Sequence, residues 1–325
     1  MDRNRLLLCL LLVLVSREGL FGQNSNGSLP GSQLRRTEDS AELRYWLANM
    51  HRHQYSKMEM QQVTGLSNEE LSIELVSVDQ KVYLPASAGL LVLPYPGGRH
   101  PRIGFLEGAI DPQRDTKLSA FCPWDDIGYA VLDVPEAIWS NLGLTYLAHT
   151  HIDTVWTKKS IQLEQTEWQR RSDGSYLMQR RLPNGIGFGT WAMPRQDHLE
   201  LSMWLTNDSS EALRDLRVQN CVMLKGLPGF EEQTNDNKQF ENGYATACSA
   251  DKSHWVISAW DRVHRVWGNA PCPCLHCDPK FEDCPVGETR WLRGWFSYFE
   301  GQDIQGELRR IEATGWKMRS IPDVR

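Results

Sequence analysis

Residues 198–206, with the sequence HLELSMWLT, place an aliphatic side chain at every second position. Successive side chains of a β-strand point to opposite faces of a sheet, so this period of two predicts a half-buried strand. One face would carry Leu199, Leu201, Met203 and Leu205, and the other Glu200, Ser202, Trp204 and Thr206.

The chain after about Leu90 keeps this character. Asp173-Gly174 is a strong hairpin signal. Many strands without helices between them predict a mainly β fold, a large antiparallel β-sandwich over residues 81–325. Strands are predicted over 129–134, 144–152, 168–171, 175–182, 216–224, 254–260 and 290–299.

A short helical segment is predicted over residues 38–80, the only convincing helical stretch of the chain. Ser40 can cap its first helix, Gly65 can end its second, and Ser67 with Glu70 forms a capping box for a third. Part of the segment resembles a helix-turn-helix. The net charge of −6, from 35 Lys and Arg against 41 Asp and Glu, nevertheless argues against a nucleic-acid partner.

The N-terminus has the pattern of a secretory signal. Arg3 and Arg5 precede the apolar run Leu6–Val15, which is too short to span a bilayer as a helix. We therefore expect a signal peptide over residues 1–22, a flexible leader over 23–37 and a secreted or periplasmic protein; an uncleaved N-terminal anchor is the alternative. No later segment is predicted to cross a membrane.

The block DHLELSMWLTNDSSEALRDLRVQNCVML, residues 197–224, resembles the core hairpin of β-supersandwich proteins, the galactose-mutarotase-like superfamily. The blocks PGGRHPRIGF, YLAHTHI and LPNGIGFG also resemble uncharacterised secreted bacterial proteins of that type. The resemblance implies an extracellular role in binding or modifying carbohydrate. A shared fold carries many functions, so it implies no particular reaction.

A glycine-rich loop over residues 97–117 concentrates charged side chains of both signs. Arginine offers planar donors that suit the carboxylate or sulfate of an acidic sugar. Glu107 lies among apolar residues, and burial would raise its pKa and suit it to acid–base work. The alternative is a solvated loop with surface ion pairs. The candidate ligand-binding residues here are Arg99, His100, Arg102, Arg114 and Lys117.

His149 and His151 are separated by one residue, within a predicted strand. Side chains at i and i+2 of a strand share a face, so both imidazoles can converge on one point. With Glu107 they are the candidate catalytic residues. Two alternatives remain open: a metal site that needs a third ligand, and an ordinary polar strand.

Trp124 and Asp125 join the candidate ligand-binding residues, because an indole beside carboxylates can contact a sugar. The chain has 13 tryptophans, and core packing is the alternative for most of them. Carboxylates of Asp125 and Asp126 could instead hold Ca²⁺.

Four cysteines, Cys272, Cys274, Cys277 and Cys284, lie within 13 residues. An exported protein is expected to use them in disulfides. The alternative is a structural zinc ion, although the spacing departs from the usual pairs. Either the disulfides or the zinc ion would hold a proline-rich loop in place. No other cofactor is predicted.

These observations predict an exported β-sandwich protein that binds carbohydrate and modifies it if it is an enzyme. Its Arg and Lys side chains would hold an anionic group of the sugar. A non-catalytic interaction module of the cell envelope and a metal-dependent hydrolase using His149 and His151 are the alternatives. The chain has no serine-elbow, phosphate-loop, zinc-protease or dinucleotide motif.

Overall fold

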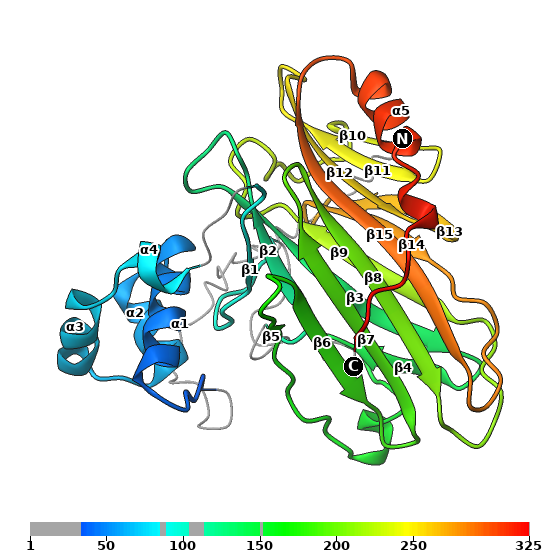
Figure 1. Ribbon diagram of the computed structural model, residues 1–325, viewed down its shortest axis with the longest axis horizontal. Helices are drawn as coiled ribbons and strands as arrows, with labels where there is room; N and C mark the ends of the chain where they lie inside the picture. The colour runs from blue at the N-terminus through cyan, green and yellow to red at the C-terminus, as the bar shows by residue number, and fades with distance from the viewer. Residues whose placement is uncertain (1–33, 85–88, 104–113, 150–151, 325) are drawn as a thin grey trace, which may run out of the picture.

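The computed structural model describes residues 34–84, 89–103, 114–149 and 152–324. Two antiparallel sheets dominate this part of the chain (Figure 1). Sheet A has the order β1 (Val92–Pro94), β2 (Lys117–Phe121), β3 (Tyr129–Ser140), β9 (Arg217–Met223), β14 (Cys274–Pro279), β13 (Val263–Asn269), and β4 (Gly143–Leu147) pairs with β3. Sheet B has the order β10 (Lys238–Glu241), β11 (Tyr244–Cys248), β12 (His254–Trp260), β15 (Thr289–Glu300), β8 (His198–Asn207), β7 (Ile186–Pro194), β6 (Tyr176–Arg181), β5 (Gln169–Arg170).

The main hydrophobic core lies between the two sheets, which confirms the predicted mainly β sandwich. Leu132 and Val222 of sheet A and Leu201 and Val256 of sheet B belong to one buried cluster. The alternation predicted for β8 is confirmed, because its aliphatic residues all lie in this cluster. Each sheet therefore has an inner face on the core and an outer face turned away from it.

The predicted hairpin over residues 197–224 is wrong. Strand β8 pairs with β7 and β15 of sheet B, whereas β9 pairs with β3 and β14 of sheet A. The connection between them crosses the end of the sandwich and buries Leu213 and Leu216 in the core. Those two leucines close the space between the sheets, which a tight turn within one sheet would leave open.

Helices α1 (Ser40–Arg52), α2 (Lys57–Thr64), α3 (Asn68–Val76) and α4 (Gln80–Tyr83) form the expected N-terminal segment. Gly65, at a φ of 74°, ends α2, and Ser67 with Glu70 forms the predicted capping box of α3. Asp39, rather than Ser40, caps α1. The segment has its own small core and lies beside β1 and β2 (Figure 1).

Helix α5 (Ile304–Ala313) lies outside the stretch where the sequence predicted helix. Its buried residues Ile304, Leu308 and Ile311 have helical spacing and pack with Trp255 and Trp295 on the outer face of sheet B. Asp303 caps the helix. The spacing was a readable signal, although Gly306 within the helix weakens it.

The C-terminal residues continue over the same sheet (Figure 1). The backbone oxygen of Arg319 accepts a hydrogen bond from Arg293 Nε at 2.6 Å. Val324 packs near Trp191 and Trp204, which leaves Trp204 only 7% exposed. Trp204 does lie opposite the leucines of β8, as expected, but the chain itself covers that face.

Gly189 in β7 shows how tightly this face is packed. A Cβ atom there would lie 2.3 Å from Cζ2 of Trp204 and 2.4 Å from the backbone oxygen of Met178. We expect Gly189→Ala to lower the free energy of unfolding by about 1–3 kcal/mol, because a backbone oxygen cannot yield as a side chain can. Urea unfolding measures this. Gly187→Ala is the control, since its nearest contact is 3.9 Å away; equal losses in both variants would contradict the prediction.

Within the described residues, no helix combines the length and apolar character needed to cross a membrane.

Candidate functional site

The outer face of sheet A carries a set of charged and polar side chains that is unusual for a buried surface. The pleat of β14 turns Cys274, His276 and Asp278 outward while Leu275 and Cys277 enter the core. On β3 the register shifts between Asp133 and Ala137. A bulge of this kind re-aims a side chain, and Glu136 lies within it.

Glu136 is the centre of a buried network. Its Oε1 atom lies 2.7 Å from His149 Nε2 and accepts a hydrogen bond from Arg102, and its Oε2 atom accepts one from Gln219 Nε2 at 2.9 Å. Arg102 comes from the loop after β1, His149 follows β4, and Gln219 lies on β9. Glu136 and His149 are 1% and 2% exposed. We call these four residues the Glu136 network.

Burial and neighbouring charge set the protonation state of the Glu136 network. Burial alone would raise the pKa of Glu136, but Arg102 and His149 outweigh it and hold that pKa well below its usual range. Burial also lowers the pKa of His149, against the attraction of Glu136. At neutral pH the network therefore contains an ionised carboxylate and a neutral imidazole whose Nε2–H donates to it.

A cavity of about 330 Å³ lies next to the Glu136 network, between the helical segment and sheet A. This volume is at the lower end of the range found for small-molecule sites. We call it the sheet-A cavity. Its lining is Glu59, Tyr95, Arg99, His100, Pro101, Tyr129, Val131, Lys225 and Gly226.

Arg99 and His100 have different partners in the sheet-A cavity. Arg99 pairs with Glu59 through Nε at 2.7 Å and Nη2 at 2.9 Å. His100 Nδ1 accepts the backbone N–H of Arg102 at 3.0 Å, and the oxygen of His100 accepts from Lys225 Nζ at 3.0 Å. His100 and Arg102 therefore connect the cavity to the Glu136 network.

The structure brings together part of the predicted site. Arg102 and His149, far apart in the sequence, lie 3.5 Å apart at Nη2 and Nε2. The strand predicted over 144–152 is shorter in the structure, since β4 ends at Leu147 and His149 follows it. Glu107 and His151 lie outside the described residues.

The other predicted ligand-binding residues neither line the sheet-A cavity nor belong to the Glu136 network. Lys117 is buried and pairs with Asp133 at 3.0 Å. Arg114 is buried and pairs with Glu167 at 2.9 Å. Both cations are therefore neutralised within the protein.

Trp124 and Asp125 belong to the turn between β2 and β3. The Trp124 ring lies 4.5 Å from that of His254 on sheet B and packs against the main core. Asp125 Oδ1 accepts the backbone N–H groups of Ile127 and Gly128, at 2.7 and 3.0 Å. These contacts are those of a structural turn.

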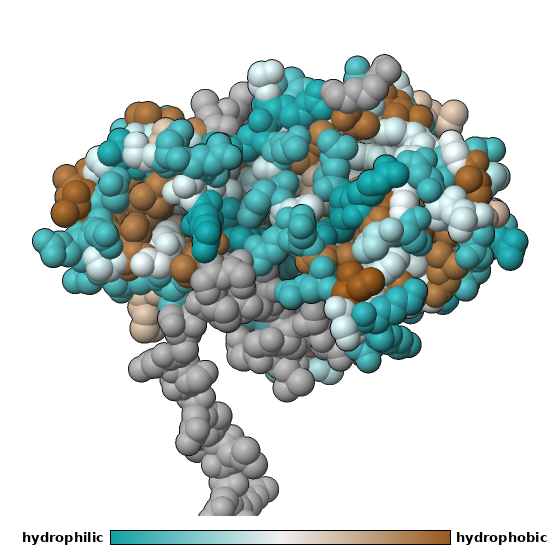
Figure 2. All heavy atoms as spheres, turned by 90° about the horizontal axis from the view of Figure 1, so that it is seen from below, coloured by the Kyte–Doolittle hydropathy of each residue, from teal (hydrophilic) through white to brown (hydrophobic). Residues whose placement is uncertain are grey.

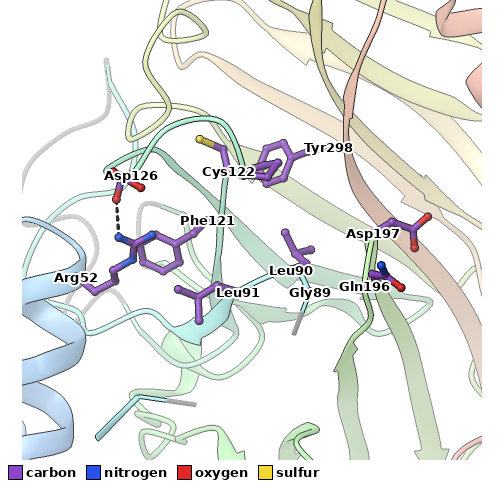
Figure 3. Close-up of a pocket in the computed structure, with 11 residues that line it drawn as sticks. Arg52, Gly89, Leu90, Leu91, Phe121, Cys122, Asp126, Gln196, Asp197 and Tyr298 are labelled. Carbon is purple, nitrogen blue, oxygen red and sulfur yellow. Dashed lines mark hydrogen bonds between the residues drawn. The ribbon is translucent and has the colours of Figure 1, made fainter. Parts of the chain in front are cut away.

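A second cavity, of about 640 Å³, lies near this turn (Figure 3). Leu90, Leu91 and Phe121 form part of its wall, and Arg52 donates to the backbone oxygen of Asp126 at one end. Asp197, on its far side, pairs with His198 and with Arg310. Arg52 and Asp197 thus have structural partners, and this cavity, unlike the sheet-A cavity, is not linked to the Glu136 network by any of these contacts.

The seven described cysteines are all unbonded, so the predicted disulfides are not present among them. The cluster cysteines are divided because residues 274–279 form a strand. Cys277 and Cys284 lie in the main core, whereas Cys272 and Cys274 lie on the outer face of sheet A. In the described chain, the one group with metal-ligand spacing is instead Cys221, Cys274 and His276.

Sequence reasoning missed Glu136 and Gln219. One signal was available for Glu136: residues 129–139, YAVLDVPEAIW, are apolar except for Asp133 and Glu136. A charged residue inside such a run is either paired or functional, because burial of an isolated charge is costly.

Comparisons with known proteins give limited similarity. No family model matches the sequence, and no curated protein matches it. A putative kojibiose phosphorylase from human microbiome is similar in structure, with 8% identity, 72% coverage of this chain, 36% of that chain and a TM-score of 0.37. A polysaccharide lyase is similar with 12% identity, 69% and 35% coverage and a TM-score of 0.34. The Slr1438 protein from Synechocystis sp. PCC 6803 is similar with 10% identity, 65% and 91% coverage and a TM-score of 0.34.

The chain thus spans 36% and 35% of the phosphorylase and lyase chains that it matches. The galactose-mutarotase-like resemblance remains an expectation from the sequence.

Proposed function

We propose that this chain is an exported protein that binds an anionic carbohydrate in the sheet-A cavity. The observation that carries the proposal is the link between a ligand-sized cavity and the buried Glu136 network through His100 and Arg102. Lys225 is exposed at the rim of the cavity, whereas the charge of Arg99 is balanced by Glu59. Export is proposed from the basic and apolar N-terminal sequence.

The chemistry of the lining supports a sugar ligand. Tyr95 and Tyr129 contribute aromatic side chains to the lining, and the Tyr129 hydroxyl accepts a hydrogen bond from Arg99. His100 offers an imidazole that burial and Arg102 keep neutral. Lys225 provides a cation for a carboxylate or sulfate. Polar groups at fixed positions around an apolar wall are typical of small-molecule sites.

Binding can be measured by titration calorimetry with neutral, uronic and sulfated sugars. We expect Lys225→Ala to weaken binding of the anionic sugar about 10- to 100-fold, since a hydrogen bond to a charged group contributes about 1.5–3 kcal/mol. Binding of a neutral sugar should change little. Lys158→Ala, at an exposed lysine outside the cavity lining, is the control. Absence of binding across the whole panel would remove the proposal.

A carbohydrate-modifying activity would use the Glu136 network. An ionised carboxylate beside a neutral imidazole is a common pair for proton transfer. Glu136→Gln should then abolish turnover while sugar affinity stays within a few-fold of that of the original protein. Equal turnover in both proteins would limit the function to binding.

The second candidate function, an interaction module, is favoured by apolar side chains exposed on the helical segment. Val76 is 89% exposed, and Met58, Ile73 and Val82 are each more than half exposed. Figure 2 shows apolar surface on this lobe, at its left. Val76→Ser with Ile73→Ser should weaken a protein partner and spare sugar binding. The metal-dependent hydrolase stays a prediction, since His151 lies outside the described residues.

A further inference from the structure

We propose that Cys221, Cys274 and His276 bind one thiophilic metal ion on the outer face of sheet A. This inference goes beyond the proposed carbohydrate function. It names a site that differs from the four-cysteine cluster predicted from sequence, with which it shares only Cys274.

The sheet register places the three side chains together. Cys274 and His276 share the outer face of β14, two residues apart, and continuation of the β14–β9 register sets Cys221 opposite His276. Their ligand atoms all lie within 4.8 Å of one another, and Cys274 Sγ is 3.4 Å from His276 Nε2. A tetrahedral zinc ion places sulfur and nitrogen ligands about 3.5 Å apart, given Zn–S near 2.3 Å and Zn–N near 2.0 Å.

The surroundings of His276 fix one ring nitrogen for coordination. Its Nδ1 atom lies 2.9 Å from the backbone oxygen of Asn220, so Nδ1 carries the proton and the Nε2 lone pair points toward sulfur. The ring also stacks on Trp267, with centroids 3.9 Å apart. Metal-bound histidines characteristically donate their other N–H to a carbonyl or carboxylate in this way.

Charge balance suits the same ion. Both cysteines would lose their protons to solvent on binding, so two thiolates with Zn²⁺ form a neutral unit. Arg102 Nη2 also lies 3.6 Å from Cys221 Sγ, where it can stabilise a thiolate. Cu⁺ shares the preference for sulfur and imidazole, and so the experiment includes both ions.

The test begins with the full chain stripped of metal under reducing conditions. Zn²⁺ and Cu⁺ are each titrated in competition with a chromophoric chelator, and Co²⁺ is added to report thiolate-to-metal charge transfer. We expect one equivalent of Zn²⁺ or Cu⁺ and a charge-transfer band with Co²⁺. Cys274→Ser and His276→Gln should weaken binding by about 100-fold or more, because even outer partners of metal ligands contribute 10- to 100-fold.

Cys277→Ser is the matched control, since Cys277 lies on the same strand but faces the core. Circular dichroism checks that each variant is folded. If a variant does not fold, the Co²⁺ spectrum of the unchanged protein still tests the proposal. Sugar binding is measured separately, so a failure of the metal proposal can be distinguished from a failure of the proposed carbohydrate function. Three results would overturn the proposal: substoichiometric binding of both ions, equal weakening by Cys277→Ser, or a Cys221–Cys274 disulfide in the purified protein.

Discussion

Replacement of Arg102 with methionine is expected to lower the free energy of unfolding by about 3–5 kcal/mol. The variant leaves the ionised carboxylate of Glu136 buried beside His149 and Gln219 without its cation. Removal of one partner from a buried ion pair lowers the free energy of unfolding by more than the intact pair contributes to it, because the remaining charge is unpaired and cut off from water. Urea unfolding at neutral pH measures the change.

Two further variants give this prediction its controls. Arg102→Met combined with Glu136→Gln should lose less stability than the single variant, because the unpaired charge is gone. Arg181→Met breaks an exposed pair with Asp208 at 3.1 Å, and should cost less than about 1 kcal/mol. A loss below about 1 kcal/mol for Arg102→Met would mean that water reaches Glu136.

The second large effect is a loss of stability in mild acid that depends on His53. This imidazole joins the helical segment to the sandwich: Nδ1 lies 2.9 Å from the oxygen of Asn49, and Nε2 lies 2.7 Å from Ser119 Oγ on β2. Burial lowers the pKa of His53 to about 3. The unfolded chain, with a histidine pKa near 6.5, takes up this proton first as the pH falls.

The free energy of unfolding should therefore fall between pH 6.5 and 3, by about 2 kcal/mol from His53 alone at pH 5. His53→Gln removes this term, so the loss between pH 7 and pH 5 should be about 2 kcal/mol smaller in the variant. Other buried histidines contribute to both proteins and cancel in the difference. An unchanged pH dependence would contradict the prediction, as would an NMR titration placing the pKa of His53 near 6.5.

Local patterns predicted most elements of the fold and the hairpin of β5 and β6 at Asp173-Gly174, but not the partners of β8 and β9. The alternation in 198–206 and the capping box at Ser67 are confirmed because each depends only on near neighbours in the sequence. The partner of β8 could not be predicted in the same way. Its connection to β9 is as compatible with a hairpin as with a crossing between sheets, and long-range packing of Leu213 and Leu216 decides between them.

The site was predictable to a smaller extent. Arg102 and His149 were candidates by residue type, and the structure places them together. Glu136, which joins them, was marked only as a charge inside an apolar run, and its contacts depend on the bulge in β3 beside Pro135. The disulfides predicted among the four clustered cysteines are absent for a related reason. Strand β14 turns Cys274 and Cys277 to opposite faces of the sheet, and Cys274 lies near Cys221 of β9 instead.

Glu59 of α2 lines the same cavity as Tyr129 of sheet A, so the helical segment and the sandwich both form that surface. A shortened chain starting at Leu90 would keep the interior between its sheets but would lack one wall of that surface. The sugar site proposed above would then depend on the docking of the helices as well as on the sheet.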